Sequence, residues 1–89
     1  MKDSYLEVTF RHGRVLAAYY YLPRRAGQKS YRTEEVEPGI VVDYSRAGRP
    51  IGIEITAPDR VTVTKMNRVL KHLGQPILRP EDLAPLRAA

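Results

Sequence analysis

Two carboxylates in the middle of the chain come closest to a chemical site. Asp43 and Glu54 lie in neighbouring stretches that both alternate apolar and polar residues. If these stretches pair so that Val41 faces Glu54 and Asp43 faces Gly52, the carboxylates are diagonal neighbours on one face. A close carboxylate pair can hold a divalent cation or share a proton. Because no third acidic or histidine ligand is assignable nearby, we favour a solvated face, or salt bridges to Arg32 or Arg14 on an adjacent strand.

The remaining nucleophiles and bases are scattered. His12 falls in a tight turn and His72 on the polar side of a predicted helix, each without a partner at metal-ligand spacing. Ser4, Ser30 and Ser45 lie in terminal or loop contexts, and no phosphate-binding glycine motif is present. The sequence therefore predicts a protein that is not an enzyme and that uses no metal and no cofactor.

Positive charge is unevenly distributed along the chain, whose net charge is +5. Between Glu7 and Glu34 there is no carboxylate, and a second basic group lies on the predicted helix. Such segments grip phosphates, and Tyr31 could stack on a base, although solvated charge is the commoner situation. We keep nucleic-acid binding as the alternative function, with these candidate residues: Arg24, Arg25, Lys29, Arg32, Lys65, Arg68 and Lys71.

Length and composition limit the class of protein. The 89 residues are expected to form a single domain, residues 1–89, that buries about 60–65% of its unfolded surface. Cysteine is absent, no apolar run is long enough to span a membrane, and the N-terminus lacks a signal-peptide core. We therefore expect a cytoplasmic protein with no membrane contact.

Apolar alternation and turn residues predict five extended segments. His12-Gly13 separates the first two, and Pro38-Gly39 precedes the fourth. Three glutamates make the third segment a solvated edge. The predicted strands cover residues 5–10, 15–22, 31–37, 40–44 and 51–55.

The last two strands form a hairpin with one large apolar face. Pairing Val42 with Ile53 brings six large side chains together, which predicts core. The six are Ile40, Val42, Tyr44, Ile51, Ile53 and Ile55.

A helix should follow this hairpin, since Met66, Leu70 and Leu73 recur at helical spacing. Thr62 is its predicted N-cap and Gly74 ends it, before a short turn at residues 80–83. The predicted fold is α+β, with a mostly antiparallel four- to five-stranded meander sheet and one C-terminal helix packed on a face.

The second strand is apolar on both of its faces, which a sheet with one wet face does not require. It is either central and covered on both sides, or one face meets another chain. If the isoleucine-rich face takes the helix, the remaining face needs other cover. We therefore predict a homodimer whose interface contains Leu16, Ala18, Tyr20 and Leu22.

The run EVEPGIVVDYSRAGRPIGIEI, followed by VTVTKMNRVLKHLG, resembles the bacterial domain of unknown function family numbered 2283. The likeness covers nearly the whole chain, apart from an N-terminal hairpin that replaces an acidic start in shorter members. The resemblance transfers no catalytic residues. It implies a small module that binds a protein partner, with an antitoxin-like role beside toxin-like proteins as one form of that function.

Overall fold

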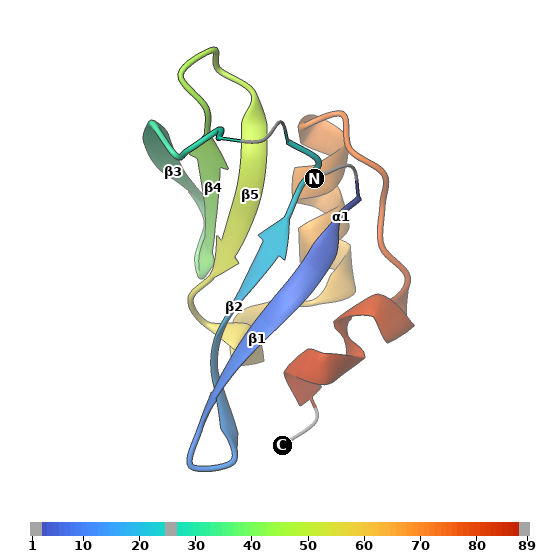
Figure 1. The fold of residues 1–89 in the computed structure, drawn as a ribbon. Helices are drawn as coiled ribbons and strands as arrows, with labels where there is room; N and C mark the ends of the chain where they lie inside the picture. The colour runs from blue at the N-terminus through green and yellow to red at the C-terminus, as the bar shows by residue number, and fades with distance from the viewer. Residues whose placement is uncertain (1–2, 25–26, 88–89) are drawn as a thin grey trace.

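Five antiparallel strands form the open sheet that dominates the molecule (Figure 1). The computed structural model describes residues 3–24 and 27–87. The chain folds as α+β, in agreement with the sequence prediction. Its elements are β1 (Tyr5–Arg11), β2 (Arg14–Tyr21), β3 (Arg32–Glu37), β4 (Ile40–Tyr44), β5 (Pro50–Ile55), the short 3₁₀ helix η1 (Pro58–Arg60), the helix α1 (Val63–His72) and the 3₁₀ segment η2 (Pro80–Arg87).

The order of the strands differs from the predicted meander. In the sheet the order is β1-β2-β5-β4-β3, so β5 lies between β2 and β4. A meander would place β2 beside β3, which would bury a strand that carries three glutamates. The observed order leaves β3 at an edge, as predicted, and places the apolar strands β2 and β5 side by side.

The hairpin of β4 and β5 has the predicted register over most of its length. Val42 pairs with Ile53 and Ile40 pairs with Ile55, and all four side chains are buried. The register shifts next to Asp43, so Tyr44 pairs with Pro50 and not with Ile51. The shift changes the end of the hairpin and leaves its core unchanged.

One face of the sheet is covered by α1 and η2, and we call it the covered face (Figure 1). Met66 and Leu70 of α1 are fully buried, and Leu73 packs against the same core. The predicted helix is confirmed, including its cap, because the Thr62 hydroxyl accepts a hydrogen bond from the Lys65 amide at 3.2 Å.

The predicted interface patch belongs to the covered face. Tyr20 pairs with Ile53 and Ala18 pairs with Ile55, and paired residues project from the same side of a sheet. Helix and isoleucines therefore cover Ala18, Tyr20 and Leu22 within one chain, at 4%, 9% and 1% exposure. The predicted interface at Leu16, Ala18, Tyr20 and Leu22 is therefore wrong for Ala18, Tyr20 and Leu22, whereas Leu16 is exposed and its interface role stays a prediction. A homodimer stays a prediction, without the patch that motivated it.

An irregularity in β2 separates Leu16 from this patch. Thr9 pairs with Ala17 and Phe10 with Val15, so Leu16 has no partner in the ladder and is 52% exposed. The extra residue turns Val15 toward the covered core, against the simple alternation expected from the sequence.

The C-terminal segment gives the sheet a second cover. The sequence predicted a turn at residues 80–83 that Pro85 interrupts, but η2 continues through Pro85 to Arg87. Its Leu83 and Leu86 are buried in the core. The Arg87 guanidinium donates to the Pro58 carbonyl at 3.0 Å and also to the Val61 carbonyl, so η2 is held against η1.

Candidate functional site

On the opposite side of the sheet, which we call the open face, no helix formed by the described residues lies over the strands (Figure 1). Cross-strand pairing places one residue of each strand in a single row across it. Three of the five are exposed carboxylates, and Tyr19 and Val41 are half-buried between them. In strand order the row is Glu7, Tyr19, Glu54, Val41 and Glu35.

A second row runs beside the first. It contains Tyr5, Tyr21, Gly52, Asp43 and Thr33, again one from each strand. Asp43 is 7% exposed, although it lies on the open face. A carboxylate this well covered needs a polar partner.

Tyr19 supplies that partner by lying across β5. Its hydroxyl donates to Asp43 Oδ2 at 2.6 Å, over the position of Gly52. A Cβ on Gly52 would lie 2.0 Å from the Tyr19 hydroxyl oxygen, so only glycine leaves room for the ring. Burial, followed by the bond to Asp43, raises the pKa of Tyr19 to about 12. This phenol is therefore protonated at neutral pH and is not a nucleophile.

The other two tyrosines of the open face stack on each other. The rings of Tyr5 and Tyr21 are 4.4 Å apart and nearly parallel, and the Tyr19 ring is 4.6 Å from Tyr21. The Tyr21 hydroxyl donates to Glu7 Oε1 at 3.3 Å. Desolvation, followed by the charge of Glu7, raises the pKa of Tyr21.

Arg24 shows how a guanidinium binds to this face. Its guanidinium lies 5.2 Å from the centre of the Tyr21 ring and donates to the Ile51 carbonyl at 2.8 Å. Arg24 was predicted to contact phosphate, but it lies on the tyrosines of the open face.

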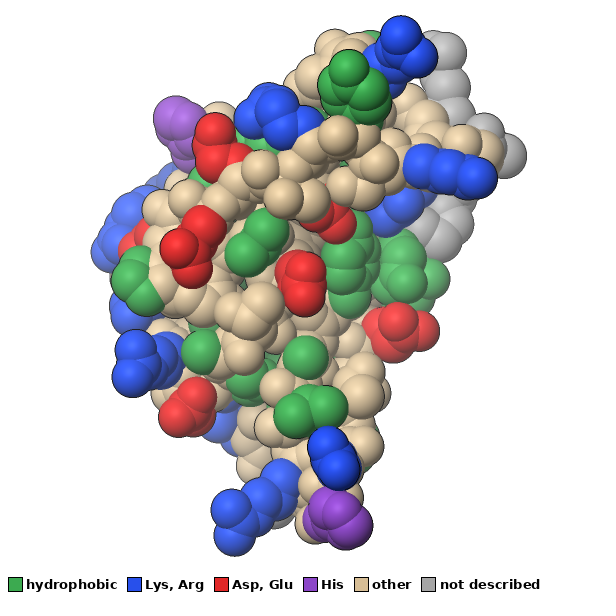
Figure 2. Space-filling model, turned by 90° about the vertical axis from the view of Figure 1, so that its left-hand side faces the viewer, with side chains coloured by type: hydrophobic (Ala, Val, Ile, Leu, Met, Phe, Trp, Pro, Cys, Tyr) green, Lys and Arg blue, Asp and Glu red, His purple; other side chains and the backbone are tan. Residues whose placement is uncertain are grey.

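The charge of the open face differs in sign from that of the chain. Its two central rows carry four carboxylates and no basic residue, whereas the net charge is +5. Figure 2 shows acidic and hydrophobic side chains together over the middle of this side, with Lys and Arg mainly toward the rim. Asp43 and Glu54 are diagonal neighbours as predicted, and Asp43 is bonded to Tyr19.

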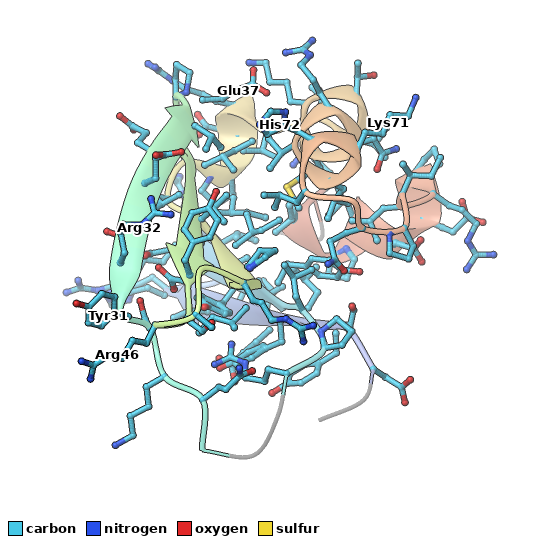
Figure 3. The ribbon with its side chains drawn as sticks, turned by 90° about the horizontal axis from the view of Figure 1, so that it is seen from above. Tyr31, Arg32, Glu37, Arg46, Lys71 and His72 are labelled. Atoms are coloured by element: carbon cyan, nitrogen blue, oxygen red, sulfur yellow. The ribbon has the colours of Figure 1, made fainter. Side chains whose placement is uncertain are left out.

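The predicted phosphate-binding residues do not form one surface. Lys71 projects from α1 on the side away from Arg32, which lies on β3 (Figure 3). The Arg68 guanidinium is 2.8 Å from Glu37 Oε1, and Lys65 Nζ donates to the Arg60 carbonyl at 3.2 Å. Lys29 is exposed in the loop before β3, and Arg25 lies outside the described residues.

A second basic group, missed in the sequence, lies where the loops before β3 and after β4 meet. The Arg46 guanidinium is 5.6 Å from the centre of the Tyr31 ring, and that of Arg32 is 4.2 Å from the Tyr44 ring. Figure 3 shows Tyr31 and Arg46 beside each other. The exposed aromatic residue at position 31 could have indicated this group, but nothing local in the sequence links Tyr31 to Arg46.

A groove of about 730 Å³ separates β3 from α1. Glu34 and Glu37 line one wall, and Arg68 and His72 line the other. In Figure 3, Glu37 and His72 lie on facing sides of this gap. Because its charges are mixed, the groove selects no ligand of one sign.

Within residues 3–24 and 27–87, no three acidic, histidine or cysteine side chains are placed to hold a metal ion. His12 is in the β1–β2 turn and His72 is at the end of α1, so the two imidazoles do not share a site.

Residues 17–57 match the model of a family described as protein of unknown function (DUF2283). Over this segment the chain is similar to that family. The DUF2283 segment runs from β2 to just beyond β5 and contains Tyr19, Asp43 and Gly52. It leaves out β1, α1 and η2, which complete the open face and cover the other one.

Comparison with curated proteins and with solved structures finds no match to this chain. In the part of the chain that the structure describes, no helix has the length and apolar character needed to cross a membrane.

Proposed function

We propose that this chain is a protein-binding module whose open face docks a basic segment of a partner protein. The observation that carries the proposal is the row in which Glu7, Glu54 and Glu35 alternate with Tyr19 and Val41. Carboxylates supply charge for lysine or arginine, and tyrosine and valine supply area that can be buried on binding.

The geometry around Arg24 supports arginine as a preferred contact. Its guanidinium already lies over Tyr21 and donates to a backbone carbonyl of β5. An arginine from a partner would meet the same chemistry on the neighbouring row, where exposed carboxylates add charge-assisted hydrogen bonds. The proposed partner therefore presents a basic surface that contains arginine.

A second copy of the chain is a poor occupant of this face. A twofold axis through the open face would bring the row of Glu7, Glu54 and Glu35 against itself, and like charges in contact oppose association. The antitoxin-like role implied by the family resemblance stays a prediction, which a basic partner would fit.

The test is an NMR titration of the isotopically labelled protein with a synthetic arginine-rich peptide. We expect amide shifts on the central strands and a several-fold weaker affinity for Glu54→Gln, because it removes the middle carboxylate. Glu81→Gln is the matched control, since it makes the same charge change on an exposed side chain of η2. An acidic peptide of equal length should cause no shifts in the two rows of the open face.

The triple variant Glu7→Gln, Glu35→Gln, Glu54→Gln separates binding from folding. We expect its unfolding free energy to change by no more than about 0.5 kcal/mol per site, because all three side chains are exposed. Equal peptide affinity for wild type and triple variant would refute the proposal.

A further inference from the structure

The end of the sheet formed by the β2–β3 loop and the β4–β5 turn differs in charge from the open face. Tyr31 is 67% exposed there, more than any other large hydrophobic side chain described. Its amide donates to the Tyr44 carbonyl at 2.8 Å, so the backbone at this ring is held as a continuation of the sheet. An exposed ring on a fixed backbone can accept a stacking partner with little loss of conformational entropy.

Both segments at this end carry basic residues. Arg46 lies over Tyr31, while Lys29 and Arg49 are exposed in the same two connections. Among the described residues, none of these three takes part in an ion pair. Their charges are therefore available to an anionic ligand.

The β4–β5 turn, which carries Arg46 and Arg49, is held by hydrogen bonds within it. The Ser45 amide donates to the Arg49 carbonyl at 2.8 Å, and the Ser45 carbonyl accepts from the Gly48 amide at 2.9 Å. The Arg49 amide also donates to the Ser45 hydroxyl at 3.3 Å. These bonds fix the backbone positions of Arg46 and Arg49, whose side chains extend into solvent.

We propose that this end binds single-stranded nucleic acid, with a base stacked on Tyr31 and phosphates held by Lys29, Arg46 and Arg49. Aromatic stacking next to backbone-contacting cations is the usual arrangement for single strands. A lone exposed ring favours a single strand, because a duplex keeps its bases stacked on one another. Arg46, whose guanidinium lies 5.6 Å from the ring centre, would move to a phosphate when the base arrives.

This site is independent of the proposed protein-binding face. The carboxylates of the open face repel phosphate, which keeps a strand at the loop end of the sheet. The helix residues are not part of this site, because Arg68 pairs with Glu37, Lys65 donates to the Arg60 carbonyl, and Lys71 points away from Tyr31 (Figure 3).

The experiment is fluorescence anisotropy with a labelled single-stranded oligouridine at about 50 mM salt. We expect Tyr31→Ala to weaken binding about tenfold and Tyr31→Phe to retain it, because stacking needs the ring and not the hydroxyl. Arg46→Gln should weaken binding and lower the slope of log affinity against log salt by about one.

Arg14→Gln is the matched control. It makes the same charge change at the β1–β2 turn, which lies at the opposite end of the molecule (Figure 1). We expect wild-type affinity for this variant. Equal losses for Arg14→Gln and Arg46→Gln would overturn the proposal, because they would indicate only general charge attraction. Absence of wild-type binding at low salt, unchanged binding by Tyr31→Ala, or preference for duplex would each overturn it too.

Discussion

The two faces of the sheet are stabilised by different interactions. On the covered face, isoleucine, valine and leucine side chains are withdrawn from water by α1 and η2, and several are fully buried. On the open face, a tyrosine hydroxyl bonds a covered carboxylate, and stacked rings lie among exposed glutamates. Burial of apolar area contributes most of the stability of a small domain, so the open face can carry polar groups without a large loss of stability.

The comparison also shows why β2 is apolar on both sides. Its residues Ala18, Tyr20 and Leu22 enter the core, whereas Tyr19 and Tyr21 form the aromatic part of the open face. An apolar second face therefore needs no second chain when its side chains are tyrosines that pack on one another and keep their hydroxyls bonded.

Truncation on the covered face should have the largest effect. Ile53 is fully buried in the middle of β5, so Ile53→Ala should lower the unfolding free energy by about 2–5 kcal/mol through lost burial and a cavity. Chemical denaturation measures this change. Val41→Ala, on the half-buried open side of β4, is the control and should cost about 1 kcal/mol or less. Equal costs would contradict the difference between the faces.

Adding a methyl group on the open face should lower the unfolding free energy by an intermediate amount. In Gly52→Ala the new Cβ meets the Tyr19 ring, which must leave Asp43, and we expect a loss of about 1–3 kcal/mol. Combining it with Tyr19→Ala removes the clash, so the double variant should cost less than the sum of the two. Strict additivity in denaturation experiments would show that the ring does not lie over Gly52.

The smallest expected effect is on the stability of the protein at alkaline pH. The folded protein holds the Tyr19 proton more tightly than the unfolded chain, since the pKa rises from 10.0 to about 12. This contribution to stability is complete below the unfolded pKa and is lost as pH rises from about 10 toward 12. Denaturation across this range should show a shallower loss for Tyr19→Phe than for wild type. Identical pH dependence would mean that the hydroxyl is not held by Asp43.

Local features of the fold could be predicted from the sequence because neighbouring residues determine them. The helix, its Thr62 cap and the pairing of Val42 with Ile53 follow from side-chain period and turn residues. His12 and Gly13 both have positive φ, 52° and 76°, as the predicted tight turn requires. The position of β3 at an edge follows from its glutamates.

The order of the strands and the open-face site were decided only by the tertiary structure. Placing β5 beside β2 joins two apolar faces that the sequence analysis had put on opposite sides, and no periodic signal encodes that contact. The extra residue at Leu16 reverses the direction of Val15, which alternation alone does not predict. Tyr19 reaches Asp43 only because Gly52, distant from both in sequence, leaves room between them. Side-chain period records which face of a strand is apolar, whereas packing between distant segments decides which face meets which.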